Sequence, residues 1–364
     1  MALPARGQGL VYPEAMGRSA LILAALAADA ASGYKFRQVR PGVERKGIDS
    51  LQLWDESANS FELKVPSSPN GERDLAVELR VLKVLAPHSA AFPFDLPHKI
   101  GESIDQDGTK AFLFTLLGGS EPDLSRLNPG VFSSSLAQAL AAIHSLPPAV
   151  VRDAGLPDFD SASILNAKVE ELDRIAATGK VPSELLSRWE QALEDVALFR
   201  FHPTVVHGSI NSDSLLLSGQ QVVGITGWSN LKVSDPAEDF SWLLTGGLPA
   251  TVDDVFLNYR AARQGSDENL MQRAALYSEL SIGNWLVYCI QNADSQSIED
   301  AEAIVDDLRI DLEAGNLRDL KASSFVGLGT ATSLLPEITS VNTAAIEIVS
   351  QPEDQRDAKS DDLF

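Results

Sequence analysis

This chain is poor in the residues that mark several common classes of protein. Only one of its 364 residues, Cys289, is a cysteine, so no disulfide can form within the chain and no zinc site can be built from cysteines. The five histidines are scattered and show no metal-ligand spacing. Cys289 lies in an apolar helical pattern, which predicts a buried structural thiol rather than a nucleophile.

Positive charge is also scarce. The 29 Lys and Arg residues are outnumbered by 51 Asp and Glu residues, which gives a formal net charge of −22. Nucleic acids and anionic membrane surfaces attract a basic face, so this charge argues against both as partners. An acidic surface is compatible with a cationic ligand, although solvated surface carboxylates explain it more simply.

Long apolar runs are absent. The alanine-rich residues 19–31, SALILAALAADAA, fall short of the roughly 20 apolar residues that span a bilayer. Glu14 and Arg18 precede this segment, which is unlike the start of a secretory signal. We therefore expect an amphipathic helix here, no membrane partner and a cytoplasmic protein.

The first third of the chain has the pattern of a small sheet with helices. Leu51 and Leu53 alternate with polar residues, which is typical of a strand with one buried face. Leu75, Leu79 and Leu82 recur at helical spacing. The pattern predicts strands within residues 35–66 and near residues 99–102 and 110–116, with a helix over residues 72–85.

Beyond Gly118 and Gly119 the apolar spacing becomes helical. Helices are expected over residues 136–146, 185–197, 253–262, 270–290 and 298–313, and a hairpin over residues 215–217 and 222–225. We predict an α+β fold with an N-terminal lobe (residues 1–117), a helical lobe (118–315) and a tail (316–364). The charged end of the tail, residues 353–364, is expected to be disordered.

Lys64 and Glu78 stand where a strand–loop–helix unit would bring them together. Lys64 lies within an expected strand, and Glu78 lies one helical turn from Leu75 and Leu82. Glu78 therefore faces the core, where an acidic side chain needs a partner. Enzymes that transfer phosphate use such a pair to hold the nucleotide phosphates. These two residues alone are equally compatible with a surface lysine and a solvated glutamate.

Three motifs follow one another between Val205 and Leu244. They are HGSINSDS (residues 207–214), VGITGW (223–228) and DPAEDF (235–240). They resemble the HGDxHPGN loop, the hairpin ending in IDW and the DPAxDF segment of the aminoglycoside phosphotransferase family, within it the macrolide phosphotransferase-like branch. The resemblance extends over residues 15–315, including the LKVP segment around Lys64 and the LAQALAAIHSLP helix. It implies a protein-kinase-like fold with a sheet lobe and a larger helical lobe.

The positions that would act on phosphate depart from this pattern. Ser209 stands where the family has its catalytic aspartate, Ser214 where it has a metal-binding Asn or His, and Gly227 where it has the metal-binding aspartate. Serine is a poor general base and glycine offers no ligand, whereas magnesium favours carboxylate oxygens. The residues to which the resemblance assigns the shaping of the loops are present: His207, Gly208, Trp228, Asp235, Pro236 and Asp239. Capping or buried hydrogen bonding is a further expectation for Asp239.

Two neighbouring carboxylates are candidate substitutes. Asp213 precedes Ser214 and a rearranged loop could bring it to a metal or to the reacting group, while Asp235 follows Gly227 by eight residues. Both would need backbone shifts, and a misplacement of ~1 Å can cost ~100-fold in rate. The resemblance also implies ATP as the nucleotide, with its base at the hinge near Thr115 and Leu117. The missing ligands argue against magnesium.

Three hypotheses remain on the sequence. The first is a catalytically impaired member of the family that acts as a binding or regulatory module and retains weak nucleotide binding. The second is an active ATP-dependent O-phosphotransferase, for an acceptor such as a cationic antibiotic, that uses Asp213 or Asp235. The third is an interaction protein that binds no nucleotide, with residues 325–335 docked on a partner or on the helical lobe. We favour the first, because three positions of one constellation are replaced together.

Overall fold

The computed structural model describes residues 18–42, 47–263, 265, 267–292 and 295–322. These residues belong to one compact unit, so the predicted boundary between residues 117 and 118 divides a single unit and stays a prediction. The tail segments 325–335 and 353–364, for which docking and disorder were predicted, lie outside the described residues.

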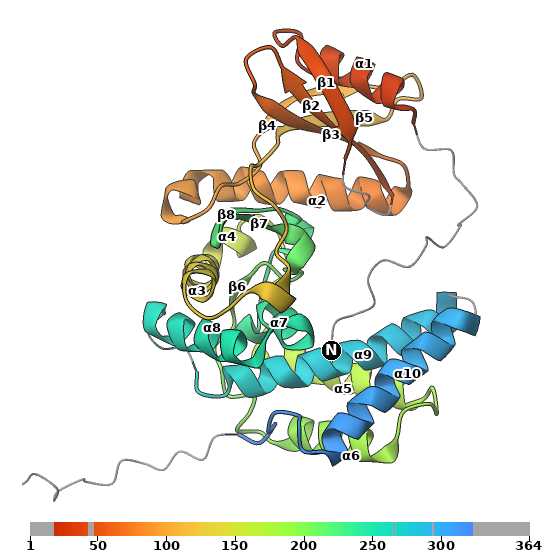
Figure 1. Ribbon diagram of the computed structural model, residues 1–364, viewed down its shortest axis with the longest axis vertical. Coiled ribbons are helices and arrows are strands. Elements are labelled where there is room, and N and C mark those ends of the chain that lie inside the picture. Colours follow the sequence, from red (N-terminus) through yellow and green to blue (C-terminus); the bar gives the residue numbers. More distant parts are fainter. Residues whose placement is uncertain (1–17, 43–46, 264, 266, 293–294, 323–364) are drawn as a thin grey trace, which may run out of the picture. The chain divides into compact units, whose positions relative to one another are not determined.

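A five-stranded antiparallel sheet forms the first part of this unit, in the order β1-β2-β3-β5-β4. Helix α1 (Ala20–Ala30) packs on this sheet through Leu23, Leu26 and Ala27, which share a small core with the strands (Figure 1). The sheet pairs Lys64 of β3 with Phe112 of β5. The strands are β1 (Phe36–Pro41), β2 (Ile48–Asp55), β3 (Ser60–Pro66), β4 (Lys99–Ile104) and β5 (Lys110–Thr115).

Helix α2 (Pro69–Leu85) connects the sheet to the rest of the protein. Its start is set by Ser68, whose side chain accepts a hydrogen bond from the backbone of Gly71, and by Pro69 at the first helical position. The apolar side chains of α2 join the large core of the helical part rather than the small core under α1. The helix predicted over residues 72–85 is therefore confirmed, and it begins three residues earlier.

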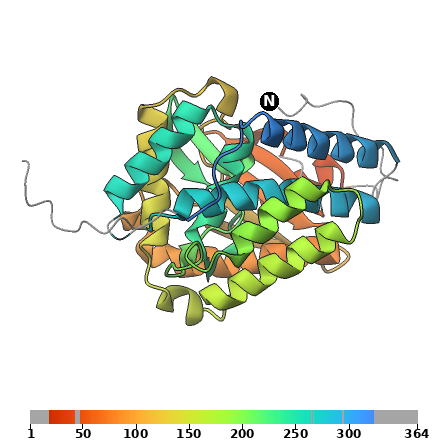
Figure 2. The ribbon, with the colours of Figure 1, turned by 90° about the horizontal axis from the view of Figure 1, so that it is seen from below.

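The helical part is organised around α9 (Leu270–Asn292), which packs against α5, α7 and α10 (Figures 1 and 2). Buried leucines along α9, among them Leu276, Leu280 and Leu286, hold these neighbours through the large core. The other helices are α3 (Val131–His144), α4 (Ala149–Arg152), α5 (Ser161–Ala176), α6 (Ser183–Glu194), α7 (Ser241–Gly246), α8 (Pro249–Ala262) and α10 (Ser295–Glu313).

Two short antiparallel strand pairs place the motif loops. The hairpin β7 (Leu215–Ser218) and β8 (Gln221–Ile225) was predicted and is confirmed. The pair β6 (Thr204–Val206) and β9 (Lys232–Ser234) was not predicted, because each strand is only three residues long. This second pair brings the loop after Val206 next to the segment that follows Ser234. The hydrogen bond from Thr226 N to Ser214 O (2.9 Å) ties the two loops together.

The α+β class predicted from the sequence is confirmed, as is the buried state of Cys289. Helix α5 is the largest element that the sequence analysis missed. Among the residues that the structure describes, no helix is both long and apolar enough to cross a membrane.

Candidate functional site

The side chains of Lys64 and Glu78 form a buried ion pair. Lys64 Nζ lies 3.1 Å from both carboxylate oxygens of Glu78, and the two side chains are 1% and 4% exposed. A second carboxylate, that of Glu62, lies 3.8 Å from the ammonium group, and the ring of Phe114 lies 5.1 Å away. The predicted pairing is confirmed. Its role toward nucleotide phosphates stays a prediction, since these neighbours enclose the ammonium group.

The predicted hinge contacts, Thr115 and Leu117, are engaged within the protein. Thr115 N donates to His98 O (2.8 Å), and Thr115 Oγ1 accepts from His98 N (2.9 Å). Leu117 packs on Gly224 so closely that an added Cβ there would lie 2.9 Å from Leu117 Cδ1. These contacts fasten the hinge to the residue before β4 and to β8, and a role in holding a nucleotide base stays a prediction.

The loop at residues 207–214 has its shape fixed by local contacts. Gly208 has φ +79°, and an added Cβ would lie 2.4 Å from Asn230 O, so no other residue fits without a shift of the backbone. Asn211 Oδ1 accepts from the backbone N–H groups of Asp213 (2.9 Å) and Ser214 (3.1 Å). Ser214 Oγ in turn accepts from Asn211 N (2.8 Å) and donates to Asn211 O (2.9 Å). The hydroxyl of Ser214 therefore stabilises the turn formed by residues 211–214.

Ser209 and Asp213 are the exposed residues of this loop that the sequence analysis singled out. Ser209 borders the cavity described below. Asp213 has its carboxylate 3.4 Å from the hydroxyl of Ser212, and its backbone N–H is held by Asn211. Asp213 therefore lies at the surface of the loop as a solvated carboxylate.

Gly227 and Ser214, the two positions that correspond to metal ligands, adjoin each other. A Cβ built on Gly227 would meet only Ser214 Cβ within 4 Å, at 3.9 Å, so there is room for a side chain between them. Gly227 has φ +80°, a conformation that Asp and Asn tolerate better than most residues. No group of three or more His, Cys, Asp or Glu side chains able to hold a metal ion occurs in the described part of the chain.

Asp239 holds the start of the loop from beneath. Its fully buried carboxylate accepts from the backbone N–H groups of His207 (2.8 Å) and Gly208 (2.8 Å) and from His144 Nε2 (3.1 Å). Burial alone would raise the pKa of Asp239. The hydrogen bonds from His144 and Gly208, together with the nearby histidines, hold that pKa below its ordinary value. Asp239 is therefore an ionised anchor, which agrees with the expected buried hydrogen bonding of this residue.

His144 continues this buried chain of polar groups. Its Nδ1 lies 2.7 Å from Tyr259 Oη, and that oxygen accepts a hydrogen bond from Arg263 (3.0 Å). The tyrosine therefore donates to Nδ1, and His144 carries its proton on Nε2, facing Asp239. Burial lowers the pKa of His144 and raises the pKa of Tyr259, so both side chains are neutral near pH 7.

Asp235 forms a second buried anchor. Its two oxygens lie 2.6 and 3.0 Å from Nε and Nη2 of Arg273, and Tyr277 Oη donates to it at 2.7 Å. Burial alone would lower the pKa of Arg273, but Asp235 and Asp267 raise it above its ordinary value. Asp235 also accepts from Ala237 N (2.9 Å). These contacts occupy both oxygens, so they give no support to the predicted use of Asp235 as a substitute metal ligand.

Trp228 and His207 complete the framework. Trp228 Nε1 donates to Ile225 O (2.9 Å), and its ring lies 4.6 Å from the ring of His207 and 6.2 Å from that of Phe94. His207 Nε2 lies 3.0 Å from Thr226 O. These contacts agree with the loop-shaping role that the resemblance implies for both residues.

A cavity of about 910 Å³ opens beside the loop. Ser209 borders it together with side chains from α5, α7 and α9, and its volume lies within the range of sites for small molecules. Its apolar walls include Leu124, Phe159, Ile164 and Trp242, and its polar walls include Lys168, Glu171, Lys232, Glu238, Tyr277 and Asn284.

The charges in this cavity cancel in pairs. Lys168 Nζ lies 2.8 Å from Glu171 and 4.5 Å from the ring of Tyr277. Lys232 Nζ lies 2.7 Å from Glu238, which also accepts a hydrogen bond from the hydroxyl of Ser234. The cavity therefore has no excess charge of either sign from these four side chains.

The sequence analysis missed these cavity residues together with helix α5. A signal for the helix was present: Asp160 caps its first turn, and Ile164, Leu172 and Ile175 recur on one buried face. Nothing comparable marks Lys232 and Glu238 as neighbours, because β9 and the turn after it bring them together only in the folded chain.

The chain is similar in sequence and in fold to known phosphotransferases. Residues 45–277 match the family model described as the phosphotransferase enzyme family. The apoenzyme of the macrolide 2′-phosphotransferase MphH from Brachybacterium faecium superposes with a TM-score of 0.66 at 19% identity, over 79% of this chain and 97% of that one. Macrolide 2′-phosphotransferase type I gives a TM-score of 0.63 at 22% identity, over 77% and 94% of the two chains.

The GDP and kanamycin complex of the phosphotransferase APH(2″)-IIIa gives a TM-score of 0.63 at 16% identity, over 79% of this chain and 98% of that one. At these identities the likeness shows a shared fold. The uncharacterized protein YcbJ of Bacillus subtilis (strain 168) is 24% identical over 110 residues, which are 30% of this chain and 36% of that protein.

Proposed function

Because the chain belongs to the phosphotransferase enzyme family, we propose that it binds a small organic molecule in the cavity beside residues 208–212 without phosphorylating it. The observation that carries this proposal is the division within the motif segment. The anchors Asp235 and Asp239 are buried and fully hydrogen-bonded, while Ser209, Ser214 and Gly227 supply no carboxylate.

The missing carboxylates remove two parts of phosphoryl transfer. Without an acid at residue 209, no side chain there accepts the proton of an attacking hydroxyl. Without oxygen ligands at residues 214 and 227, a magnesium ion loses the protein contacts that would place it on the phosphates. Serine at residue 214 does not compensate, because its hydroxyl is engaged with the backbone of Asn211.

Nucleotide binding is expected to be weak and independent of magnesium. Lys64 has three N–H donors, and two of them face the oxygens of Glu78 at 3.1 Å. The remaining donor lies among Glu62 and Phe114, so a phosphate has to displace protein contacts to reach it. We therefore expect the protein to bind the ligand in the cavity more tightly than it binds ATP.

The lining favours an amphipathic ligand over a polycation. A ligand with several ammonium groups needs unpaired carboxylates, but Glu171 and Glu238 already have lysine partners. The rings of Phe159 and Trp242 offer apolar surface to a large, weakly charged molecule. Among the ligand classes named for the similar structures, macrolides fit this description better than kanamycin.

Calorimetric titration with erythromycin and with kanamycin tests the binding site. Ala167 is exposed on α5 and borders the cavity, so Ala167→Trp fills the entrance without disturbing the core. Ala162→Trp, on the exposed surface of the same helix, is the matched control. We expect erythromycin to bind more tightly than kanamycin, and about tenfold more weakly to Ala167→Trp only. Equal affinities for both variants would contradict the proposed site.

A second titration tests the nucleotide part. We expect ATP affinity to be the same with and without magnesium in the natural protein, and to gain magnesium dependence in a Ser209→Asp, Ser214→Asn, Gly227→Asp variant. Magnesium dependence in the natural protein would favour an active phosphotransferase instead. The candidate catalytic residue is then Asp213, because its exposed carboxylate has room to turn toward the reacting group.

A further inference from the structure

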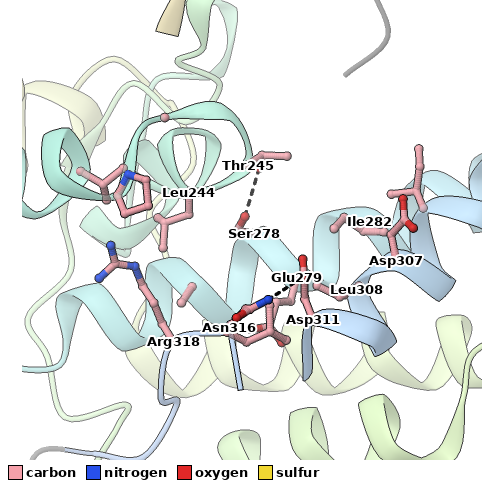
Figure 3. Close-up of a pocket in the computed structure, with 16 residues that line it drawn as sticks. Leu244, Thr245, Ser278, Glu279, Ile282, Asp307, Leu308, Asp311, Asn316 and Arg318 are labelled. Carbon is pink, nitrogen blue, oxygen red and sulfur yellow. Dashed lines mark hydrogen bonds between the residues drawn. The ribbon is translucent and has the colours of Figure 1, made fainter. Parts of the chain in front are cut away.

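A second cavity, of about 490 Å³, lies in the helical part and is separate from the one beside the loop (Figure 3). It is enclosed by α7, the start of α8, α9, α10 and residues 316–318. Thr245 borders both cavities, and its hydroxyl lies 3.0 Å from that of Ser278. This contact between α7 and α9 forms the wall between them.

The wall of the second cavity is mostly apolar. Its apolar members come from each of the enclosing helices, so the surface is continuous rather than a single stripe. They include Leu244, Val252, Ala275, Ile282, Ile304 and Leu308. A volume of this size, with an apolar wall and a few polar groups, is typical of a site for a small organic molecule.

Two of the four charged residues that line this cavity are already paired. Glu279 accepts from Nε and Nη2 of Arg188 (2.9 and 2.8 Å) and from Trp189 Nε1 (2.8 Å). Arg318 Nη1 lies 2.7 Å from Asp253. These contacts neutralise Glu279 and Arg318, and neither is left to balance a charged ligand.

Two carboxylates on α10 are left over. Asp307 and Asp311 lie one helical turn apart and both border the cavity. Asp311 Oδ1 accepts from the amide of Asn316 (3.1 Å), and the carboxylate of Asp307 makes no hydrogen bond or ion pair with any residue that the structure describes. In the view of Figure 3, Asp307 is drawn beside Ile282 toward one end of the cavity and Arg318 toward the other. The apolar wall therefore carries an uncompensated negative charge at one side.

We propose that this cavity binds a small organic cation, with its ammonium group on Asp307 and Asp311 and its apolar body against the aliphatic wall. An anion would meet two carboxylates without a free cation to balance them. A bare metal ion would find too few oxygen ligands on an apolar wall. A monovalent ammonium with a hydrocarbon body satisfies both surfaces, because the charge-assisted hydrogen bonds and the apolar burial act on different ends of the molecule.

Ligand-observed NMR titration of the full-length protein tests this site with two probes of the same shape. Phenethylammonium carries the charge, and 2-phenylethanol lacks it. We expect the cation to bind the natural protein at least about tenfold more tightly than the alcohol. Asp307→Asn should remove most of this preference, since a charge-assisted hydrogen bond of this kind contributes about a factor of ten or more.

Two control variants locate the effect. Asp306→Asn removes the same charge from the neighbouring residue, whose carboxylate pairs with Arg309 at the surface. Glu171→Gln removes a carboxylate from the cavity beside the loop. Both are expected to leave the affinity for phenethylammonium unchanged. The proposal is overturned if the natural protein does not prefer the cation, or if Glu171→Gln abolishes the preference and Asp307→Asn does not. Failure of macrolide binding in the other cavity would leave these outcomes unaffected.

Discussion

Two sets of positions within residues 205–240 differ in what they do for the protein. Asp235 and Asp239 are fully buried, and each carboxylate has at least three hydrogen-bond donors around it. Ser209 and Ser214 lie on the loop whose start Asp239 holds, and Gly227 lies on the loop after β8. None of the three carries a charge. The two sets are close in sequence, yet only the first set bonds to side chains of distant helices, His144 of α3 and Arg273 of α9.

This difference separates folding from chemistry. The anchors satisfy buried backbone N–H groups and a buried guanidinium, so the fold requires them whether or not phosphate is transferred. The acting positions face open space or their own turn, so their replacement costs the fold little. A chain can therefore keep the outline of a phosphotransferase loop after the reacting groups are gone.

The largest effect is expected from Asp235→Ala. This change removes one of the two bidentate partners of the buried Arg273, leaving Asp267, and it also removes the acceptor of Tyr277. We therefore predict a loss of about 4 kcal/mol in the free energy of unfolding. Urea denaturation measures it. Asp213→Asn removes an exposed carboxylate of the same segment and should change the stability by less than about 0.5 kcal/mol. If both variants lose a similar amount of free energy of unfolding, Asp235 is no more important to the fold than the exposed loop residue Asp213.

The Lys64–Glu78 pair gives the next largest effect. Lys64→Met removes the ammonium group that faces both carboxylate oxygens of the buried Glu78, and we predict a loss of about 3 kcal/mol in the free energy of unfolding. The double variant Lys64→Met, Glu78→Leu should recover most of it, since a hydrophobic pair can replace a buried ion pair. If the double variant is as unstable as the single one, a hydrophobic pair cannot replace this ion pair, and the prediction is wrong.

A smaller effect should appear as a pH dependence. Burial lowers the pKa of His144 below its ordinary value of 6.5. Between that value and the lowered pKa, the unfolded chain binds a proton that the folded protein does not. The free energy of unfolding should therefore fall as the pH drops from 7 to 5.

His144→Gln should flatten this pH dependence, and the matched variant of the exposed His202, His202→Gln, should leave it as it is. Urea denaturation at a series of pH values makes the comparison. If the pH dependence of the free energy of unfolding changes in His202→Gln and not in His144→Gln, the buried polar groups around His144 do not cause it.

Much of the fold could be predicted from the sequence, because it rests on local patterns. The leucine spacing before and after Glu78 placed it toward the core, and the lysine of the preceding strand was the available partner. Capping or buried hydrogen bonding was expected for Asp239, and the structure shows the second of these. Such residues are predictable when the elements that carry them follow each other directly.

The partners that lie far apart in the chain could not be predicted in this way. Arg273 meets Asp235 across 38 residues, and no periodicity in α9 marks it as a partner. The cavity residues Lys168 and Lys232 come together only once α5 and β9 are in place. The charge balance of a cavity is a property of tertiary packing, so it is visible only in the structure.

The loop at residues 207–214 keeps the shape of a phosphotransferase loop, but we propose that it does not carry out phosphoryl transfer. The most direct measurement is transfer of the γ-phosphate of ATP to a macrolide and to kanamycin in the presence of magnesium, at enzyme concentrations in excess of the acceptor. We predict that the natural protein forms no phosphorylated product. Magnesium-dependent product that disappears in both Lys64→Ala and Asp213→Asn would contradict it.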